Sequence, residues 1–212
     1  FTTEHTLSGD DLFKFCDLAL YSAKDSGKGT YCFFDKAMEV RAQQKLSLLS
    51  DMKKGLSNNE FVLHYQPQVN LHTGELTGFE ALVRWQHPTQ GLISPIDFIT
   101  LAEESGFIHV LGEFILKQSC IDALTWPEHL QIAVNFSPLQ FNNGDIFKLI
   151  SHTLSSYKLA PERLEIELTE SAMITDIERV LAILKNLQKL GVRIALDDFG
   201  TGYSSLSYLQ KI

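Results

Sequence analysis

The chain has 212 residues, a formal net charge of −8 and a hydrophobic fraction of 44%. This length fits one domain, or one domain with a fragment of another, and the acidic balance disfavours binding to a nucleic-acid polymer, which needs a basic surface. No apolar run reaches the length of about 18 residues that a membrane-spanning helix needs, and the first residues carry no signal-peptide pattern, so we expect no membrane contact from this segment.

The N-terminal region is predicted to form a helix followed by a strand. Ser8 or Asp10 is placed to cap the helix, and Gly27 is placed to end it. The stretch "TYCFFD", residues 30–35, predicts the strand. The helix prediction rests on apolar residues at helical spacing, namely Leu12, Phe13, Cys16, Ala19, Leu20 and Ala23.

Residues 36–56 predict a second helix, because "KAMEVRAQQKLSLLSDMKKGL" is rich in helix-forming residues. We expect Gly55 to end this helix. Its place between two regions of different pattern is typical of a connector between domains.

A pattern of strands and helices begins near residue 60. "FVLHYQPQVNL" and "ELTGFEALVRW" predict two strands that must be antiparallel, because the link "HTG" is too short for a parallel crossover. Helices and strands then alternate, which predicts an α/β fold with a parallel sheet. The expected helices are residues 95–106, 109–126, 144–158 and 176–191, and the expected strands are residues 130–136, 163–170 and 192–198.

The predicted strands carry polar residues on one face. Side chains alternate between the two faces of a strand, and here each strand has an apolar face for helices and a second face that ends in an acid or an amide. Four residues with oxygen side chains, Glu80, Asn135, Glu167 and Asp197, would converge at the carboxyl rim of a parallel barrel, where active sites are built. Such ligands suit Mg²⁺ or Mn²⁺. The alternative is a solvated sheet face with ordinary polar residues.

The turn "DDFGTGYSS" that follows the last predicted strand adds a second acid. Asp197 and Asp198 are neighbours, and at a strand end both are able to reach a pair of cations about 3.5–4 Å apart. The alternative role for Asp198 is to cap the next helix. A dinucleotide loop is disfavoured, since Ser205 stands where the third glycine belongs. The sequence contains no G-x-S-x-G nucleophile elbow.

Five ordered motifs resemble those of the EAL domain family. They are "YQPQV" at 65–69, "EALVRW" at 80–85, "NFSP" at 135–138, "ELTES" at 167–171 and "DDFGTGYSSL" at 197–206. The resemblance implies a bacterial phosphodiesterase that hydrolyses cyclic di-GMP to linear pGpG with two Mg²⁺ or Mn²⁺ ions. It also implies a modified TIM (β/α)8 barrel whose first strand is antiparallel to the others.

The resemblance also implies individual roles. One metal is expected to bind Glu80, Asn135, Glu167 and Asp197, and a second to bind Asp197 and Asp198, so that Glu80 and the two aspartates are catalytic. Gln66 and Arg84 resemble substrate contacts. Glu170 resembles the acid that anchors the loop at residues 199–206.

The segment "DLALYSAKDSGKG" resembles the last helix of a GGDEF, or diguanylate cyclase-like, domain. The GG[DE]EF signature itself is absent, so no cyclase activity is assigned. We therefore expect a GGDEF remnant over residues 1–35, a connector helix over 36–57 and the N-terminal part of an EAL domain over 58–212.

The barrel is expected to be incomplete, because eight strands are needed and about five are predicted. The resemblance places a catalytic lysine and a general-base glutamate beyond Ile212, so we expect this fragment to be inactive alone. A cyclic di-GMP receptor without catalysis, or a non-signalling interaction domain, is the alternative for the parent. We expect a homodimer through the EAL domain. The cysteines Cys16, Cys32 and Cys120 are far apart, which favours a cytoplasmic setting over a disulfide or zinc framework.

Overall fold

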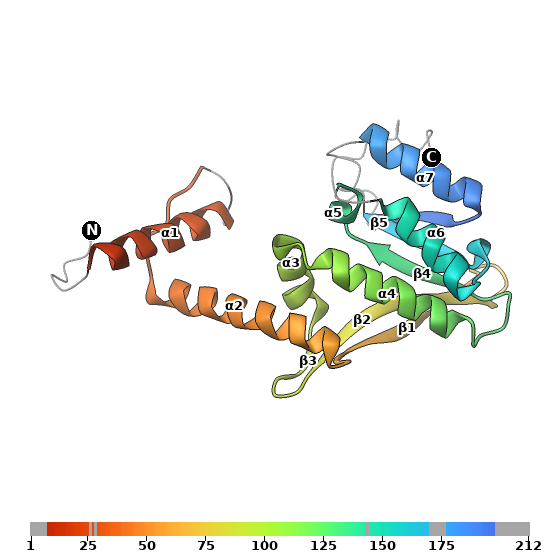
Figure 1. Cartoon of the computed structure of the whole chain (residues 1–212), viewed down its shortest axis with the longest axis horizontal. Helices are drawn as coiled ribbons and strands as arrows, with labels where there is room; N and C mark the ends of the chain where they lie inside the picture. The colour runs from red at the N-terminus through yellow and green to blue at the C-terminus, as the bar shows by residue number, and fades with distance from the viewer. Residues whose placement is uncertain (1–7, 26, 28, 143–144, 170–176, 198–212) are drawn as a thin grey trace. The chain divides into compact units, whose positions relative to one another are not determined.

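The computed structural model describes residues 8–25, 27, 29–142, 145–169 and 177–197. The chain divides into two compact units, Phe1–Lys53 and Lys54–Ile212. Helix α1 (Gly9–Asp25) and most of helix α2 (Lys36–Ser57) belong to the first unit, and the remaining elements belong to the second (Figure 1). None of the helices among the described residues is both long and apolar enough to cross a membrane.

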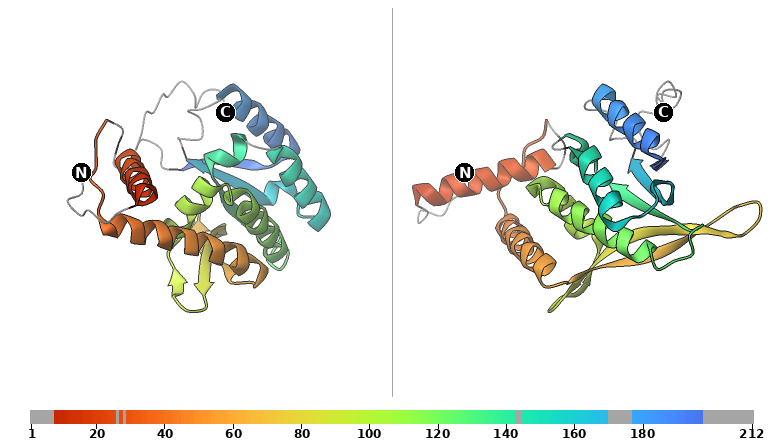
Figure 2. Two further views of the ribbon diagram at one scale, coloured as in Figure 1. Left: turned by 60° about the vertical axis from the view of Figure 1, so that its left-hand side comes forward. Right: turned by 45° about the vertical axis from the view of Figure 1, so that its right-hand side comes forward.

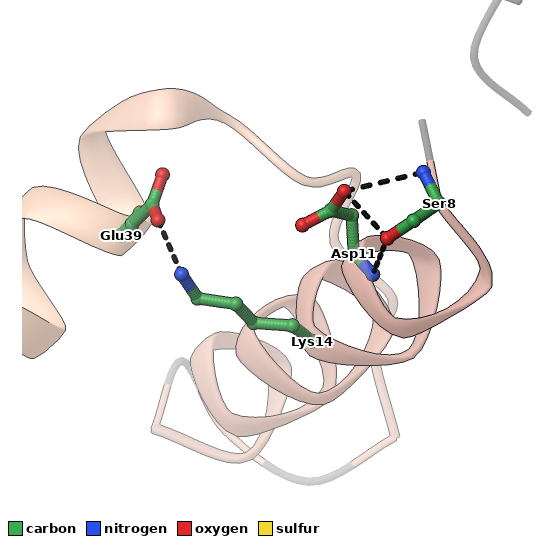
Figure 3. A network of polar contacts seen from close by, with 4 residues as sticks. All are labelled: Ser8, Asp11, Lys14 and Glu39. Carbon is green, nitrogen blue, oxygen red and sulfur yellow. Dashed lines mark hydrogen bonds and ion pairs between the residues drawn. The ribbon is translucent and has the colours of Figure 1, made fainter. Parts of the chain in front are cut away.

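Helix α1 starts where its sequence predicts. The Asp11 backbone N–H donates to Ser8 Oγ over 3.2 Å, and the Ser8 hydroxyl donates to Asp11 Oδ2 over 2.7 Å, so Ser8 rather than Asp10 caps the helix (Figure 3). The donation from the Ser8 hydroxyl, followed by that from the Ser8 backbone N–H to the same carboxylate oxygen, holds the pKa of Asp11 below its ordinary value. Lys14 of α1 forms an exposed ion pair with Glu39 of α2 at 2.5 Å, a contact of small energetic value.

The predicted strand at residues 30–35 is wrong. This segment has no secondary structure, since no strand among the described residues pairs with it. Tyr31 and Phe33 are 78% and 76% exposed, whereas Phe34 stacks on Phe15 of α1 with 4.0 Å between ring centroids. The aromatic composition predicted a strand, but in the described part of the chain the segment has no neighbouring strand to supply the hydrogen bonds that a strand requires.

Helix α2 runs past Gly55, contrary to the sequence-based prediction. It ends at Ser57, and Asn59 adopts the left-handed conformation with φ of 57°. Gly55 serves packing instead: a Cβ atom there would lie 2.7 Å from Glu60 Oε2 and 3.0 Å from Trp85 Nε1. The Trp85 indole N–H donates to the same Glu60 oxygen over 3.1 Å, so the glycine leaves room for this hydrogen bond.

The second unit is built on one mixed sheet. Strand β1 (Phe61–Val69) is antiparallel to β2 (Leu76–His87), as the short link predicts. Strands β4 (Gln131–Phe136), β5 (Leu164–Thr169) and β6 (Arg193–Asp197) continue the sheet in parallel from β2, in the order β1-β2-β4-β5-β6. The prediction missed β3 (Gly91–Ile93), a three-residue strand that pairs with the end of β2.

The helices of the second unit cover one face of the sheet (Figure 2). Below this layer lie fully buried strand residues such as Ile132, Leu164 and Ile166. The predicted helices all form, whereas α5 and the 3₁₀ turn η1 were not predicted. Their bounds are α3 Pro95–Ser105, α4 Ile108–Ala123, α5 Pro138–Asn142, α6 Ile146–Tyr157, η1 Pro161–Arg163 and α7 Ile177–Leu190. The α/β fold with a partial parallel sheet is confirmed.

Candidate metal centre

The two faces of the sheet differ as the alternation of side chains predicts. In β5, Leu164, Ile166 and Leu168 are buried under the helices. Glu165 and Glu167 point to the opposite face. The same division holds for β2, β4 and β6, so the predicted metal ligands that the structure describes lie on a single polar face.

The register of the strands brings these residues to one end of that face. Asn135 is the Cα partner of Glu167, and Asp197 is the partner of Thr169, two residues after Glu167. Glu80 lies on β2, the other neighbour of β4. Because adjacent strands are about 4.8 Å apart, side chains from neighbouring strands at this end are within reach of one another.

Glu80 and Asn135 are joined directly. The Asn135 side-chain amide nitrogen, Nδ2, donates to Glu80 Oε1 over 2.6 Å. This hydrogen bond fixes the amide so that its oxygen, Oδ1, is the atom left to act as a ligand. Asn135 is exposed on the open polar face.

Glu167 has the strongest electrostatic signature of the four. The residue is 9% exposed, and its pKa is raised to about 7, first by burial and then by the negative charges of Glu80, Glu165 and Asp197. A hydrogen bond from Gln68 Nε2 over 3.2 Å acts in the opposite direction. Like charges therefore converge on a buried carboxyl group, which is the situation that a divalent cation relieves.

The donor set fits Mg²⁺ or Mn²⁺, since it consists of carboxylate and amide oxygens. Among the residues that the structure describes, no three side chains of Asp, Glu, His or Cys are grouped closely enough to enclose a cation by themselves. The predicted ligand Asp198 and the predicted loop anchor Glu170 lie outside the described residues.

The two predicted substrate contacts lie on the same polar face. Gln66 of β1 is exposed and stands directly opposite Glu80 in the antiparallel register. Arg84 of β2 is half-buried, four residues from Glu80 and therefore on the same side of the strand. Its Nη1 donates to the Val83 carbonyl over 2.8 Å.

Gln68 is the functional candidate that the sequence analysis missed. It lies two residues after Gln66 and therefore on the same face of β1, where it contacts Glu167. This strand parity was available from the sequence. Its hydrogen bond to a residue 99 positions away was not, because the bond depends on the packing of β1 beside the parallel strands.

Strand β1 is held to the helical layer through its other face. The Tyr65 hydroxyl donates to Asp122 of α4, and Gln118 Nε2 donates to the second oxygen of Asp122 over 2.8 Å. Burial, followed by the hydrogen bond to Asp122, raises the pKa of Tyr65 above its ordinary value. This contact fixes the strand that presents Gln66 and Gln68.

A cavity of about 540 Å³ lies at the opposite, amino end of the polar face. Its lining includes Gln131, Glu165 and Arg193, near the starts of the parallel strands, together with Gln68 of β1, and does not include Glu80, Asn135 or Asp197. Arg193 Nε lies 3.4 Å from Glu165 Oε2, so this end contains its own cation. The cavity therefore adjoins the candidate metal centre through Gln68, which donates to Glu167.

Comparison with known proteins identifies the family. The EAL domain family matches residues 49–212. The chain is 50% identical over 195 residues to an "Uncharacterized signaling protein" of Caulobacter vibrioides, covering 92% of this chain and 24% of that one. It is 43% identical over 200 residues to the "Bifunctional diguanylate cyclase/cyclic di-GMP phosphodiesterase MucR" of Pseudomonas aeruginosa, covering 92% and 29%.

A solved structure described as "PaMucR Phosphodiesterase, c-di-GMP complex" superimposes with a TM-score of 0.74. It is 41% identical in sequence, and the match covers 78% of this chain and 69% of that chain. The chain belongs to the EAL domain family, and its partial parallel sheet matches the TIM-barrel-like fold of its structural neighbours. It spans less than a third of the length of the two curated relatives.

Proposed function

We propose that the full-length protein hydrolyses cyclic di-GMP to linear pGpG. The observation that carries this proposal is a set of oxygen side chains on the polar face of four adjacent strands, toward the carboxyl end of their parallel pairing, in a chain of the EAL domain family: Glu80, Asn135, Glu167 and Asp197. The relatives named as cyclic di-GMP phosphodiesterases and the solved complex with c-di-GMP support the substrate.

These four residues are proposed to hold one Mg²⁺ or Mn²⁺ ion, and Asp197 and Asp198 a second. Two such ions supply charge stabilisation of the phosphodiester and a hydroxide nucleophile at neutral pH. Asn135 contributes its Oδ1, because its Nδ2 already donates a hydrogen bond to Glu80. Gln68 would orient Glu167 through the hydrogen bond to Oε1, which leaves Oε2 as the oxygen available to the ion.

Substrate contacts are proposed for two residues of the same face. Arg84 supplies positive charge to a substrate phosphate, as a planar guanidinium does well. Gln66, opposite Glu80, supplies hydrogen bonds to the substrate beside the metal ligand. Glu170 is proposed to anchor the loop that follows Asp198.

Three proposals concern the wider protein. Residues 1–35 are the end of a GGDEF-like domain, joined through residues 36–57 to the EAL domain that begins near residue 58. The EAL domain associates as a homodimer. The protein acts in the cytoplasm.

The test is hydrolysis by the full-length protein with Mn²⁺, measured as pGpG formation by liquid chromatography. Wild type is expected to produce pGpG, and Glu80→Ala to be slower by about a thousandfold, since one ligand of the catalytic ion is lost. A Glu80→Ala variant with full activity would exclude this metal site. Tight binding of cyclic di-GMP without pGpG formation by wild type would favour the receptor alternative instead.

A further inference from the structure

The residues that follow β4 form a compact turn next to Asn135. The parallel pairing of β4 with β5 ends at Phe136 and Leu168, so Asn135 lies one residue from the end of the ladder. Helix α5 starts two residues later, at Pro138. The chain leaves the ladder after Phe136, so the contacts of Ser137 fix its path directly after the strand end that carries Asn135.

Ser137 and Gln140 form a reciprocal cap at the start of α5. The Ser137 backbone N–H donates to Gln140 Oε1 over 3.0 Å, and the Leu139 backbone N–H donates to Ser137 Oγ over 3.3 Å. The Gln140 backbone N–H also donates to the Ser137 carbonyl over 3.0 Å. This S-x-x-Q arrangement satisfies donors at both the first and the third position of the turn.

A second helix fixes the same serine. The Ser137 hydroxyl donates to Glu103 Oε1 of α3 over 2.7 Å. Ser137 is thus hydrogen-bonded through its backbone and its side chain to two separate elements, α3 and α5. A hydroxyl that both donates and accepts has little freedom to turn.

The side chain of Gln140 packs against a third helix, α4. Gln140 is 3% exposed, and a Cβ atom on Gly112 of α4 would lie 2.1 Å from its Nε2. Because Nε2 is the far end of a flexible side chain, an alanine at position 112 would displace Gln140 rather than the backbone. Because Gly112 has no side chain, it leaves the space that the Gln140 side chain occupies in the cap.

We infer that Glu103, Ser137 and Gln140 hold the metal ligand Asn135 in position, and that Gly112 leaves the space that Gln140 needs. We call the first three residues the brace. The inference rests on the proposed function. None of the three residues is assigned a contact with substrate or cation. They act by holding the end of β4, so that Asn135 Nδ2 stays on Glu80 and Oδ1 stays available.

The experiment measures Mn²⁺ binding to metal-free full-length protein by calorimetry, together with kcat and KM for cyclic di-GMP. Ser137→Ala and Gly112→Ala are each expected to weaken Mn²⁺ binding about tenfold, as residues that orient metal ligands do. At saturating Mn²⁺, KM is expected to be nearly unchanged. Ser137→Thr keeps the hydroxyl and is expected to restore binding.

A matched control removes a helix cap elsewhere. Asp145 caps α6 by accepting from the Lys148 backbone N–H over 3.1 Å, so Asp145→Ala causes the same kind of loss without touching β4. Its Mn²⁺ binding is expected to equal that of wild type. The double variant Gly112→Ala/Gln140→Ala, in which the steric conflict is gone, is expected to regain thermal stability but not Mn²⁺ affinity.

Wild-type Mn²⁺ affinity in Ser137→Ala and Gly112→Ala would overturn the brace while leaving the proposed function intact. An equal loss in Asp145→Ala would also overturn it, since the effect would then be general destabilisation. If wild type neither binds Mn²⁺ nor hydrolyses cyclic di-GMP, the proposed function and the brace fail together.

Discussion

The carboxylates at the two ends of the polar face of the sheet have different partners. At the amino end, Glu165 of β5 faces the cationic Arg193 of β6. At the carboxyl end, Glu80 and Glu167 accept hydrogen bonds from the neutral amides of Asn135 and Gln68. Glu165 at the amino end thus pairs with a cation of the protein itself, whereas Glu167 at the carboxyl end lies among the negative charges of Glu80 and Asp197, which an external cation would balance.

This comparison predicts a pH effect that belongs to the carboxyl end. Below pH 4.5 Glu167 is protonated in both folded and unfolded protein. As pH rises from 4.5 to about 7, only the unfolded state ionises readily, so the free energy of unfolding of metal-free protein falls. The upper limit of this loss is about 3 to 4 kcal/mol, at roughly 1.4 kcal/mol per pKa unit.

Denaturant unfolding of metal-free full-length protein at several pH values measures this effect. Glu167→Gln cannot ionise and is expected to remove most of the slope between pH 4.5 and 7. If the free energy of unfolding depends on pH equally in wild type and in Glu167→Gln, ionisation of Glu167 is not the cause of the effect.

A second prediction concerns stability at the amino end. Arg163 Nε donates to the Leu130 carbonyl over 2.9 Å, and its Nη2 donates to the Ala123 carbonyl over 2.6 Å. Arg163→Met is therefore expected to lower the free energy of unfolding by about 2 kcal/mol, since both carbonyls lose a charged donor. Thermal unfolding measures the loss, and Mn²⁺ affinity of the folded variant should match wild type. A large loss of affinity would mean that the two ends are not independent.

The smallest effect is expected for the ion pair at the amino end. Arg193 is 54% exposed on its side chain and the contact is 3.4 Å long, so Arg193→Gln should change the free energy of unfolding by less than about 1 kcal/mol. The substitution also leaves the Glu165 carboxylate without this ion pair. A change well above this value in denaturant unfolding would show that the pair is a structural element.

The period-two pattern of the strands was sufficient to predict which face is polar. It assigned Glu80, Asn135, Glu167 and Asp197 to that face, and the structure agrees, because strand geometry leaves only two choices for each side chain. The antiparallel β1 and β2 followed from the length of one link. These features depend on local backbone geometry, which can be predicted from neighbouring residues in the sequence.

Contacts between distant elements were not predictable. The wrong strand at residues 30–35 shows that composition does not supply a pairing partner. Gly55 looked like a helix end, but its role depends on Trp85 and Glu60, which pack beside it. The brace of Glu103, Ser137 and Gln140 connects helices α3 and α5, with Gly112 of α4 beside it, and only packing brings these elements together.

Calorimetric titration of metal-free full-length protein with Mn²⁺, comparing Glu167→Gln with Glu165→Gln, tests the difference between the two ends most directly. Both substitutions remove one carboxylate from the same strand and the same face, two residues apart. We predict that Glu167→Gln weakens Mn²⁺ binding by at least about tenfold, and that Glu165→Gln binds like wild type. Equal affinities in the two variants, or the larger loss in Glu165→Gln, would contradict a cation site at the carboxyl end.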